Sequence, residues 1–320
     1  MKVGVLQFFG WADRKIPLAS IYERAIERFE IMDRTGYDAV WLAEHHFSSF
    51  SVCPSVHMMA TMAAARTQRL RIGTAVSLAP FYHPLRLAEE VALLDVLSGG
   101  RVNWGAGRGF SRGEFAAFGI PMEESATRFR ETVDIVLRAW SEDRFAHSGE
   151  HFRFDAVEVL PKPLQQPHPP VWMAATSESA IDWAASRGFS ILMDPHCTHA
   201  ELAAKRRRYG DQLASAGFSA AGRDLPMARL IAVAPTAERA AEVARRGAGW
   251  MVGSYIGGGS SGVDPVERYV NDVIIHGTPE AVLDQILALG EAASLNYLLC
   301  APLSQESFSL ITDRILPKLA

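Results

Sequence analysis

Cysteine is scarce in this sequence of 320 residues, which contains only Cys53, Cys197 and Cys300. The three are far apart and odd in number, which excludes the paired framework of a small disulfide-rich secreted protein. We therefore expect free thiols in a reducing, cytoplasmic environment. The opening stretch MKVGVLQFFG is too short for a secretory signal and predicts a strand instead.

Long apolar runs and an excess of positive charge are missing as well. No segment approaches the roughly 18 uninterrupted apolar residues of a membrane-spanning helix, so no membrane association is expected. The formal net charge is -4 and the pI is about 6.2, which does not favour nucleic acid as a partner. The composition is otherwise ordinary, with 48% hydrophobic and 21% charged residues, as in a globular protein with a large core.

Several motifs of common active sites are absent. The chain has no H-E-x-x-H, paired C-x-x-C, G-x-S-x-G elbow or Walker loop. The segment MDPHCTH offers Asp194, His196, Cys197 and His199 as conceivable metal ligands. Metallohydrolases on a (β/α)8 barrel often carry His-x-His after the first strand, where this chain reads QFFGW. We expect no metal, with His196 and His199 serving as loop polar groups or as pocket lining.

Strand-like and helix-like segments alternate along the whole chain. Eight strand–helix units predict an α/β fold, a single (β/α)8 TIM barrel over residues 1–320. A doubly wound sheet is the alternative, but no G-x-G-x-x-G follows the first strand. Helices are predicted near residues 18–35, 54–66, 126–140, 178–187 and 199–216, in a further one that opens at Pro84, and in TAERAAEVARRGAGWM and GTPEAVLDQILALGEA.

Two segments interrupt this alternation, after the fourth and the seventh strand. Residues 141–170 predict a hairpin and a proline-rich connection, and hence an insertion. The glycine-rich GSYIGGGSSG opens the second segment, residues 253–275, whose composition suits a mobile lid. A surface insertion without such a role is the alternative for this segment.

Polar residues stand where the second predicted strand ends. DAVWLAEHHF is an apolar run that stops at Glu44, His45 and His46. Active sites of barrels lie at the carboxyl ends of the strands, which places these residues at the active-site face. Side chains alternate across a strand, so Glu44 and His45 point to opposite sides unless the strand end bends. Histidines that only form hydrogen bonds at a loop edge are the structural alternative.

Three other strand ends carry candidate binding residues. The fourth ends in GAGRGFSRG, where Arg108 suits phosphate or carboxylate and the glycines allow close approach to the backbone. The fifth ends in AATSES, where Thr176, Ser177 and Ser179 bring hydroxyls to a helix start that favours phosphate. An ordinary helix cap is the alternative there. The third ends in GTAVSLAP, whose small side chains suit a flat ring or plain core packing.

Several of these stretches together resemble the bacterial luciferase-like family of flavin-dependent monooxygenases. They are GYDAVWLAEHHF, GTAVSLAPFYHPLRLAEEVALLDVLSGGRVNWGAGRGF, AATSESAIDWAASRG and, near the C-terminus, HGTPEAVLDQI. The likeness extends through most of the chain in the same order and spacing. It implies a (β/α)8 barrel, usually a homodimer, that uses reduced FMN supplied by a separate flavin reductase.

The resemblance also implies roles for residues near the flavin ring. His45 matches the catalytic histidine of the family, and Glu44 lies beside it near the flavin. Thr74 and Ala75 match the small residues under the isoalloxazine, where the family often has a non-proline cis peptide. An imidazole titrates near working pH, so His45 is the expected general base or proton carrier.

At the phosphate, the resemblance implies that Arg108 and the helix start at Thr176, Ser177 and Ser179 bind the flavin. Gly107 stands where luciferases have a cysteine, and residue 111, a serine, where they have a tyrosine, which argues against light emission.

The implied reaction is oxygenation of a small organic substrate such as an aldehyde or ketone. Oxygen adds at C4a of reduced FMN to give a peroxide or hydroperoxide, which transfers oxygen to the substrate. Three alternatives remain: an F420-dependent oxidoreductase of the same superfamily, a metal-dependent barrel hydrolase, and a non-catalytic flavin-binding protein.

Overall fold

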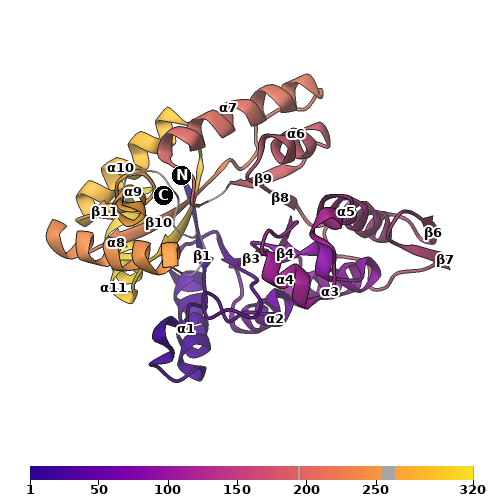
Figure 1. Cartoon of the computed structure of the whole chain (residues 1–320), viewed down its shortest axis with the longest axis horizontal. Coiled ribbons are helices and arrows are strands. Elements are labelled where there is room, and N and C mark those ends of the chain that lie inside the picture. Colours follow the sequence, from indigo (N-terminus) through magenta and orange to yellow (C-terminus); the bar gives the residue numbers. More distant parts are fainter. Residues whose placement is uncertain (194, 254–263, 320) are drawn as a thin grey trace.

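The structure, a computed structural model, describes residues 1–193, 195–253 and 264–319. Within them, parallel strands form a curled sheet that is surrounded by helices (Figure 1). Two short strands add to it: β4 (Ser77–Leu78) pairs with β5 (Val102–Gly107), and β11 (Ile275–Gly277) pairs with β10 (Pro226–Val233) at the end of the strand order. The barrel strands are β1 (Lys2–Gln7), β2 (Ala39–Leu42), β3 (Arg71–Thr74), β5 (Val102–Gly107), β8 (Val171–Ala175), β9 (Ser190–Met193), β10 (Pro226–Val233) and β12 (Tyr297–Pro302).

The order of the strands distinguishes the two predicted architectures. It runs β11-β10-β12-β1-β2-β3-β5-β8-β9, so the strands follow chain order and β1 lies between β2 and the last strand, β12. A doubly wound sheet would reverse its order at a switch point instead. β9 and β10 lie next to each other, but in the described residues no ladder joins them, and β11 occupies the second edge of β10. The predicted (β/α)8 barrel is confirmed, with an open seam between β9 and β10.

The helices predicted from periodicity are present. Of the five apolar residues at helical spacing near residues 18–35, helix α1 buries Ile21, Ala25, Phe29 and Met32, whereas Leu18 precedes the helix and is exposed. The helix ends at Gly36 with φ of 93°. Two short helices, α4 and α9, were not predicted. The helices that the text uses are α1 (Ala19–Thr35), α2 (Val56–Arg66), α3 (Pro84–Ser98), α4 (Arg112–Ala117), α5 (Ser125–Ser141), α6 (Glu178–Ser186), α7 (His199–Ser215), α8 (Ala237–Met251), α9 (Pro265–Asp272), α10 (Pro279–Ala292) and α11 (Gln305–Leu310).

Large aromatic side chains fill the inside of the barrel. Trp41 of β2 and Trp172 of β8 meet edge to face with ring centroids 5.2 Å apart. The indole N–H of Trp41 donates to the hydroxyl of Tyr297 at 3.1 Å, and that hydroxyl donates to Asp38 at 2.6 Å. Gly73 leaves the space that Trp41 needs, because a Cβ there would lie 2.2 Å from the indole ring. These three aromatic side chains fill this part of the barrel interior.

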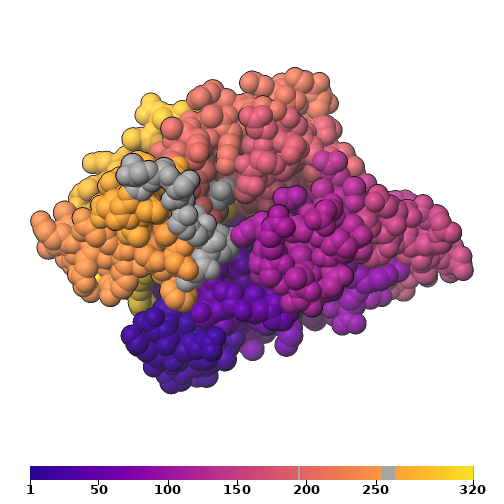
Figure 2. Space-filling model, in the orientation of Figure 1, coloured from indigo at the N-terminus to yellow at the C-terminus, as the bar shows by residue number. Residues whose placement is uncertain are grey.

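The segment at residues 141–170 contains an antiparallel hairpin outside the barrel sheet. Its strands are β6 (Phe145–Ser148) and β7 (Arg153–Val157), and Figure 2 shows this part projecting from one edge of the molecule. Glu131 of α5 holds the hairpin by accepting hydrogen bonds from the His147 ring and the Phe152 backbone N–H.

Three further expectations concern the cysteines, the lid segment at residues 253–275 and membrane-spanning helices. No disulfide joins the three cysteines, as predicted, and all three side chains are buried. In the segment expected to be a lid, residues 254–263 lie outside the described residues, whereas residues 265–272 form α9. Among the helices that the structure describes, none is long and apolar enough to cross a membrane.

Candidate active site

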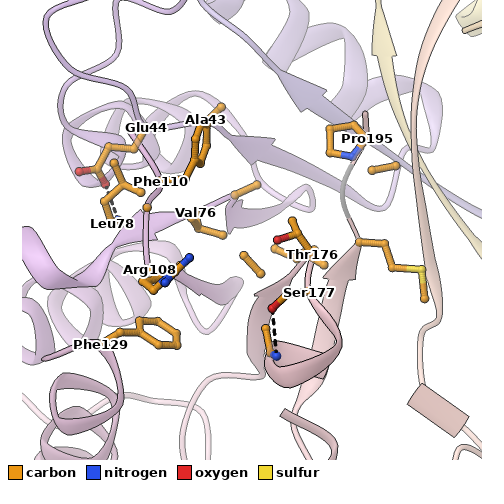
Figure 3. A pocket seen from close by; sticks show the side chains of 18 of the residues that line it. Ala43, Glu44, Val76, Leu78, Arg108, Phe110, Phe129, Thr176, Ser177 and Pro195 are labelled. Carbon is orange, nitrogen blue, oxygen red and sulfur yellow. Dashed lines mark hydrogen bonds between the residues drawn. The ribbon is translucent and has the colours of Figure 1, made fainter. Parts of the chain in front are cut away.

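A cavity of about 380 Å³ opens at the carboxyl ends of the barrel strands. Its walls come from β1, β4, β5, β8, β9, β10 and β12, from the residues that follow β2, and from helices α5 and α6. Figure 3 shows side chains from several of these elements around one shared space. The predicted site residues that line it are Glu44, His45, Ala75, Gly107, Arg108, Thr176, Ser177 and Ser179.

Glu44 is held from both sides at the end of β2, with 2% of its surface exposed. Its Oε2 accepts hydrogen bonds from the Leu78 N–H at 3.1 Å and the Tyr82 hydroxyl at 3.0 Å, and its Oε1 lies 2.9 Å from Nε2 of His46. Burial and the Glu44 carboxylate raise the pKa of Tyr82, so the phenol stays protonated and donates. Both oxygens of Glu44 are engaged, which suits positioning better than general-base catalysis.

His45 faces the cavity and is paired with a carboxylate on its other side. Its Nδ1 lies 3.8 Å from Oε1 of Glu114 in α4, and the same oxygen accepts the His46 N–H at 2.9 Å. Burial opposes ionisation of Glu114, but hydrogen bonds from the His45 ring and the His46 N–H outweigh it and lower the pKa of this carboxyl. An ionised carboxylate beside an imidazole orients the ring and selects which of its nitrogens carries the hydrogen. Glu114 was not predicted from the sequence.

His46 lies behind the cavity wall rather than in it. Its ring meets Phe118 edge to face at 4.9 Å while Nε2 bonds Glu44. His46 therefore fits the alternative in which a histidine has a structural role through its hydrogen bonds. The strand β2 ends at Leu42, so strict alternation no longer applies beyond it, and Glu44 and His45 both reach the cavity.

The segment after β3 forms one wall of the cavity through Ala75, Val76 and Leu78. The Ala75–Val76 peptide is cis, as the resemblance implied. Val76 fits tightly against Gly107 of β5, since a Cβ at that glycine would lie 2.2 Å from Cγ2 of Val76. A side chain at position 107 therefore requires a smaller residue at position 76 or a shift of the wall.

Thr74 lies behind this wall and outside the cavity lining, with 1% of its surface exposed. Its hydroxyl donates to the Gly105 carbonyl at 2.7 Å and accepts the Gly105 N–H at 2.9 Å. The position of Thr74 therefore does not support the direct contact with the cofactor that we expected for it. Its hydroxyl joins β3 to β5 instead.

Hydroxyl groups and a cation face each other at the other end of the cavity. In Figure 3, Arg108 points across the space toward Thr176 and Ser177. Ser177 also caps α6, because its Oγ accepts the Ala180 N–H at 3.3 Å. The cap and the ligand-facing position coexist, since the hydroxyl stands at the helix start where free N–H groups favour an anion.

A second arginine, not predicted from the sequence, stands at the same end. Arg130 of α5 lines the cavity, and its guanidinium lies 5.8 Å from the ring centroid of Trp183 in α6. In the part of the chain that the structure describes, neither Arg108 nor Arg130 has a carboxylate within ion-pair distance. Two cations beside a helix start make this the anion-binding end of the cavity.

Comparison with known families decides the relationship. The model of the family described as luciferase-like monooxygenase matches residues 1–295. The chain belongs to the luciferase-like monooxygenase family. Its predicted membership is confirmed, and the cavity described above lies where the strand-end rule and the resemblance both predicted the site.

Relatives within and around the luciferase-like family carry oxidoreductase names. The oxygenase component of a flavin-dependent trigonelline monooxygenase from Acinetobacter baylyi is 34% identical over 177 residues, 55% of this chain and 49% of that protein. The chain thus spans about half the length of the curated relatives it matches first, at 49% to 51%. A solved monooxygenase from Streptomyces bottropensis is 27% identical with a TM-score of 0.85 over 100% of both chains.

Two more distant structures share the fold. The oxygenating constituent of 3,6-diketocamphane monooxygenase from Pseudomonas putida, solved with FMN, has a TM-score of 0.83 at 20% identity, covering 100% of this chain and 99% of the other. An F420-dependent secondary alcohol dehydrogenase has a TM-score of 0.81 at 18% identity, with the same coverage.

The histidines after β9 occupy different surroundings. His196 lines the cavity and its Nδ1 pairs with the hydroxyl of Tyr269 in α9. His199 is the first residue of α7, outside the lining, and burial, aided by nearby Arg229, lowers its pKa. Asp194 lies outside the described residues. Among the residues that are described, no group of three or more His, Cys, Asp or Glu is placed to hold a metal.

Proposed function

We propose that this protein is the oxygenase component of a two-component monooxygenase, which uses reduced FMN and O2 to oxygenate a small organic substrate. The observation that carries the proposal is the division of the cavity. One end has two arginines, hydroxyls and a helix start, and the other has apolar walls beside a paired histidine. FMN has the same division, with an anionic phosphate at one end and a flat, largely apolar ring at the other.

The anionic end of FMN fits the groups around α6. Arg108 and Arg130 offer planar guanidinium donors, which suit the oxygens of a phosphate. Thr176, Ser177 and Ser179 add hydroxyls at the helix start. These five residues would hold the phosphate and fix the direction in which the ring enters the barrel.

The ring end has small or apolar walls that exclude water from the reacting atoms. Ala75 and Val76 form one wall, and Leu6, Leu192 and Leu299 line the inner surface of the barrel. When bound, reduced FMN supplies the electrons and the carbon that reacts with O2. The protein positions the ring, keeps the site dry and handles protons.

His45 is the residue placed to manage those protons. Its ring lines the cavity, and the Glu114 carboxylate lies 3.8 Å from its Nδ1 on the far side, where it orients the ring. The pair can therefore hold a proton beside the cavity and release it during oxygen transfer. Glu44, whose oxygens are engaged by Leu78, Tyr82 and His46, positions this segment.

The proposal includes a transient partner and a second copy of the chain. A separate flavin reductase would supply reduced FMN, as the name of the trigonelline relative, an oxygenase component, suggests.

A homodimer is supported by apolar side chains on the adjoining helices α2 and α3, where Met58, Met62, Leu93 and Leu97 are 42% to 77% exposed. Replacing Leu97 by Asp should shift the sedimentation mass from dimer to monomer, and an unchanged monomeric mass in both proteins would contradict the dimer.

The decisive experiment measures cofactor choice and oxygen transfer on the same protein. Titration with FMN, riboflavin and F420 gives the three dissociation constants, and the expected order has FMN tightest. Chemically reduced FMN, isotopically labelled O2 and a panel of aldehydes and ketones then test whether one oxygen atom enters a product. Tight F420 binding with hydride transfer and no labelled product would contradict the proposal, as would FMN binding without oxygenation of any compound.

A further inference from the structure

A buried Ser–His–Glu chain runs outward from the cavity wall, and the proposed chemistry does not use it. His57 of α2 places Nε2 3.0 Å from the hydroxyl of Ser77 and Nδ1 3.0 Å from Oε2 of Glu90 in α3. Ser77 is fully buried and His57 is 5% exposed. Glu90 in turn pairs with Arg86 at 2.7 Å on the outer side.

The protonation pattern of this chain follows from its acceptors. The hydrogen bond from His57 is the main cause that lowers the pKa of Glu90, so this carboxylate accepts and does not donate. Nδ1 of His57 therefore carries the hydrogen toward Glu90. In the neutral ring Nε2 is then an acceptor, and the Ser77 hydroxyl donates to it.

Although Ser, His and Glu occur in the order of a hydrolase triad, the serine is not placed to attack a substrate. The cavity is lined by Val76 and Leu78, the two neighbours of Ser77, but not by Ser77 itself. Its side chain points from the wall toward α2, where His57 meets it. The chain of hydrogen bonds thus fixes the back of the wall whose front faces the proposed flavin ring.

The same segment is linked to the site residues on its other sides. Ser77 and Leu78 pair with β5 as strand β4, and the Leu78 N–H donates to Glu44 at 3.1 Å. A displacement of Ser77 would therefore move Val76 in front and Leu78, the donor to Glu44. Loss of His57 would remove the hydrogen-bonding partner of the fully buried Ser77 hydroxyl, which favours such a displacement.

We propose that His57 is a positioning residue for the flavin wall, which it anchors through Ser77 to Glu90 on the next helix. The proposal rests on the proposed function, since it takes the Ala75–Leu78 segment as the surface against which the ring lies. The hydrogen bonds of His57 to Ser77 and Glu90 would therefore support the ring end of the cavity and not the phosphate end.

The test compares FMN with riboflavin, which lacks the phosphate, in His57→Phe, Ser77→Ala and the double variant. We expect His57→Phe to weaken both flavins by the same factor, about tenfold, as expected for a lost buried hydrogen bond. Ser77→Ala should act in the same direction, and the double variant should be no weaker than His57→Phe alone, because both remove one interaction. The visible absorbance of bound flavin should shift in each variant, which a role in stability alone would not produce.

The exposed His83 at the start of α3 provides the matched control, as His83→Phe makes the same change outside the chain of hydrogen bonds. If His57→Phe fails to fold, Ser77→Ala carries the test alone. Unchanged flavin affinity and absorbance in a variant that only melts earlier would overturn the inference, as would weaker binding of FMN but not of riboflavin. Failure of the unmodified protein to bind either flavin would instead overturn the proposed function itself.

Discussion

The two ends of the cavity are built in different ways. At the anion-binding end, Arg108 is exposed. The guanidinium of Arg130 lies over the ring of Trp183. At the ring end, Glu44 is 2% exposed and its carboxylate oxygens form hydrogen bonds with Leu78, Tyr82 and His46. Substitutions at the first end should therefore change affinity alone, whereas those that disturb the hydrogen bonds or the close packing of the wall at the second end should also change the fold around them.

The largest effect is expected for His45→Ala at the ring end. Removing a proton-transfer group lowers turnover by about a hundred- to ten-thousandfold. The affinity for FMN should stay within about twofold, because the phosphate contacts and the walls remain. Steady-state and single-turnover kinetics, together with FMN titration, measure the two quantities separately. Unchanged turnover would remove His45 from the reaction.

Arg108→Gln should give the next largest effect, at the anion-binding end. Loss of a charge-assisted contact should weaken FMN by roughly ten- to a hundredfold. Riboflavin affinity and thermal stability should not change, since the side chain is exposed and its phosphate partner is absent from riboflavin. The exposed Arg112, outside the cavity lining, gives the matched control Arg112→Gln. Equal losses for both flavins would contradict the separation of the two ends.

Gly107→Ala tests the close fit within the ring end. The added Cβ would meet Cγ2 of Val76 at 2.2 Å, and such overpacking costs about 1–3 kcal/mol of unfolding free energy. In a Val76→Ala background the same substitution should cost much less, because the clashing methyl is gone. Urea denaturation of the four proteins measures this coupling. Additive effects would show that the two positions do not compete for space.

The smallest effect concerns Glu114 and pH. Because its pKa is lowered in the folded protein, the stability it contributes is present at neutral pH and is lost as the pH falls below about 5 and through the folded pKa. Glu114→Gln should therefore be less stable than the unmodified protein at pH 7, with the difference shrinking in acid. Chemical denaturation across this range measures it, with the exposed Glu123→Gln as control. A difference that grows on acidification would have the wrong sign.

The strand-end residues were predictable because a barrel brings the ends of its strands together whatever their separation in the chain. This rule found His45 and Arg108, and the hydroxyls at Ser177 stood out as a helix start. It could not find Glu114 or Arg130, which lie on helices beyond the strand ends.

For Arg130 a weaker signal exists in the sequence. Ala126, Phe129 and Arg130 are three and four residues apart, one face of a helix, and all three line the cavity. For Thr74 the sequence pointed to the cavity, but it could not show that the backbone carbonyl and N–H of Gly105 hold the threonine hydroxyl within the sheet. For His57 the partner residues Ser77 and Glu90 are 20 and 33 positions away, a pairing that only the folded helices reveal.

The fit of Val76 into the space above Gly107 also bears on how this cavity can be altered. Position 107 cannot accept a larger side chain while Val76 stays as it is, so a series of single substitutions that changes Gly107 first passes through a less stable protein. A variant library that randomises position 107 alone would return mostly glycine, whatever the substrate. Randomising positions 76 and 107 together opens the combinations, including cysteine at 107 beside a small residue at 76, that stepwise change would miss.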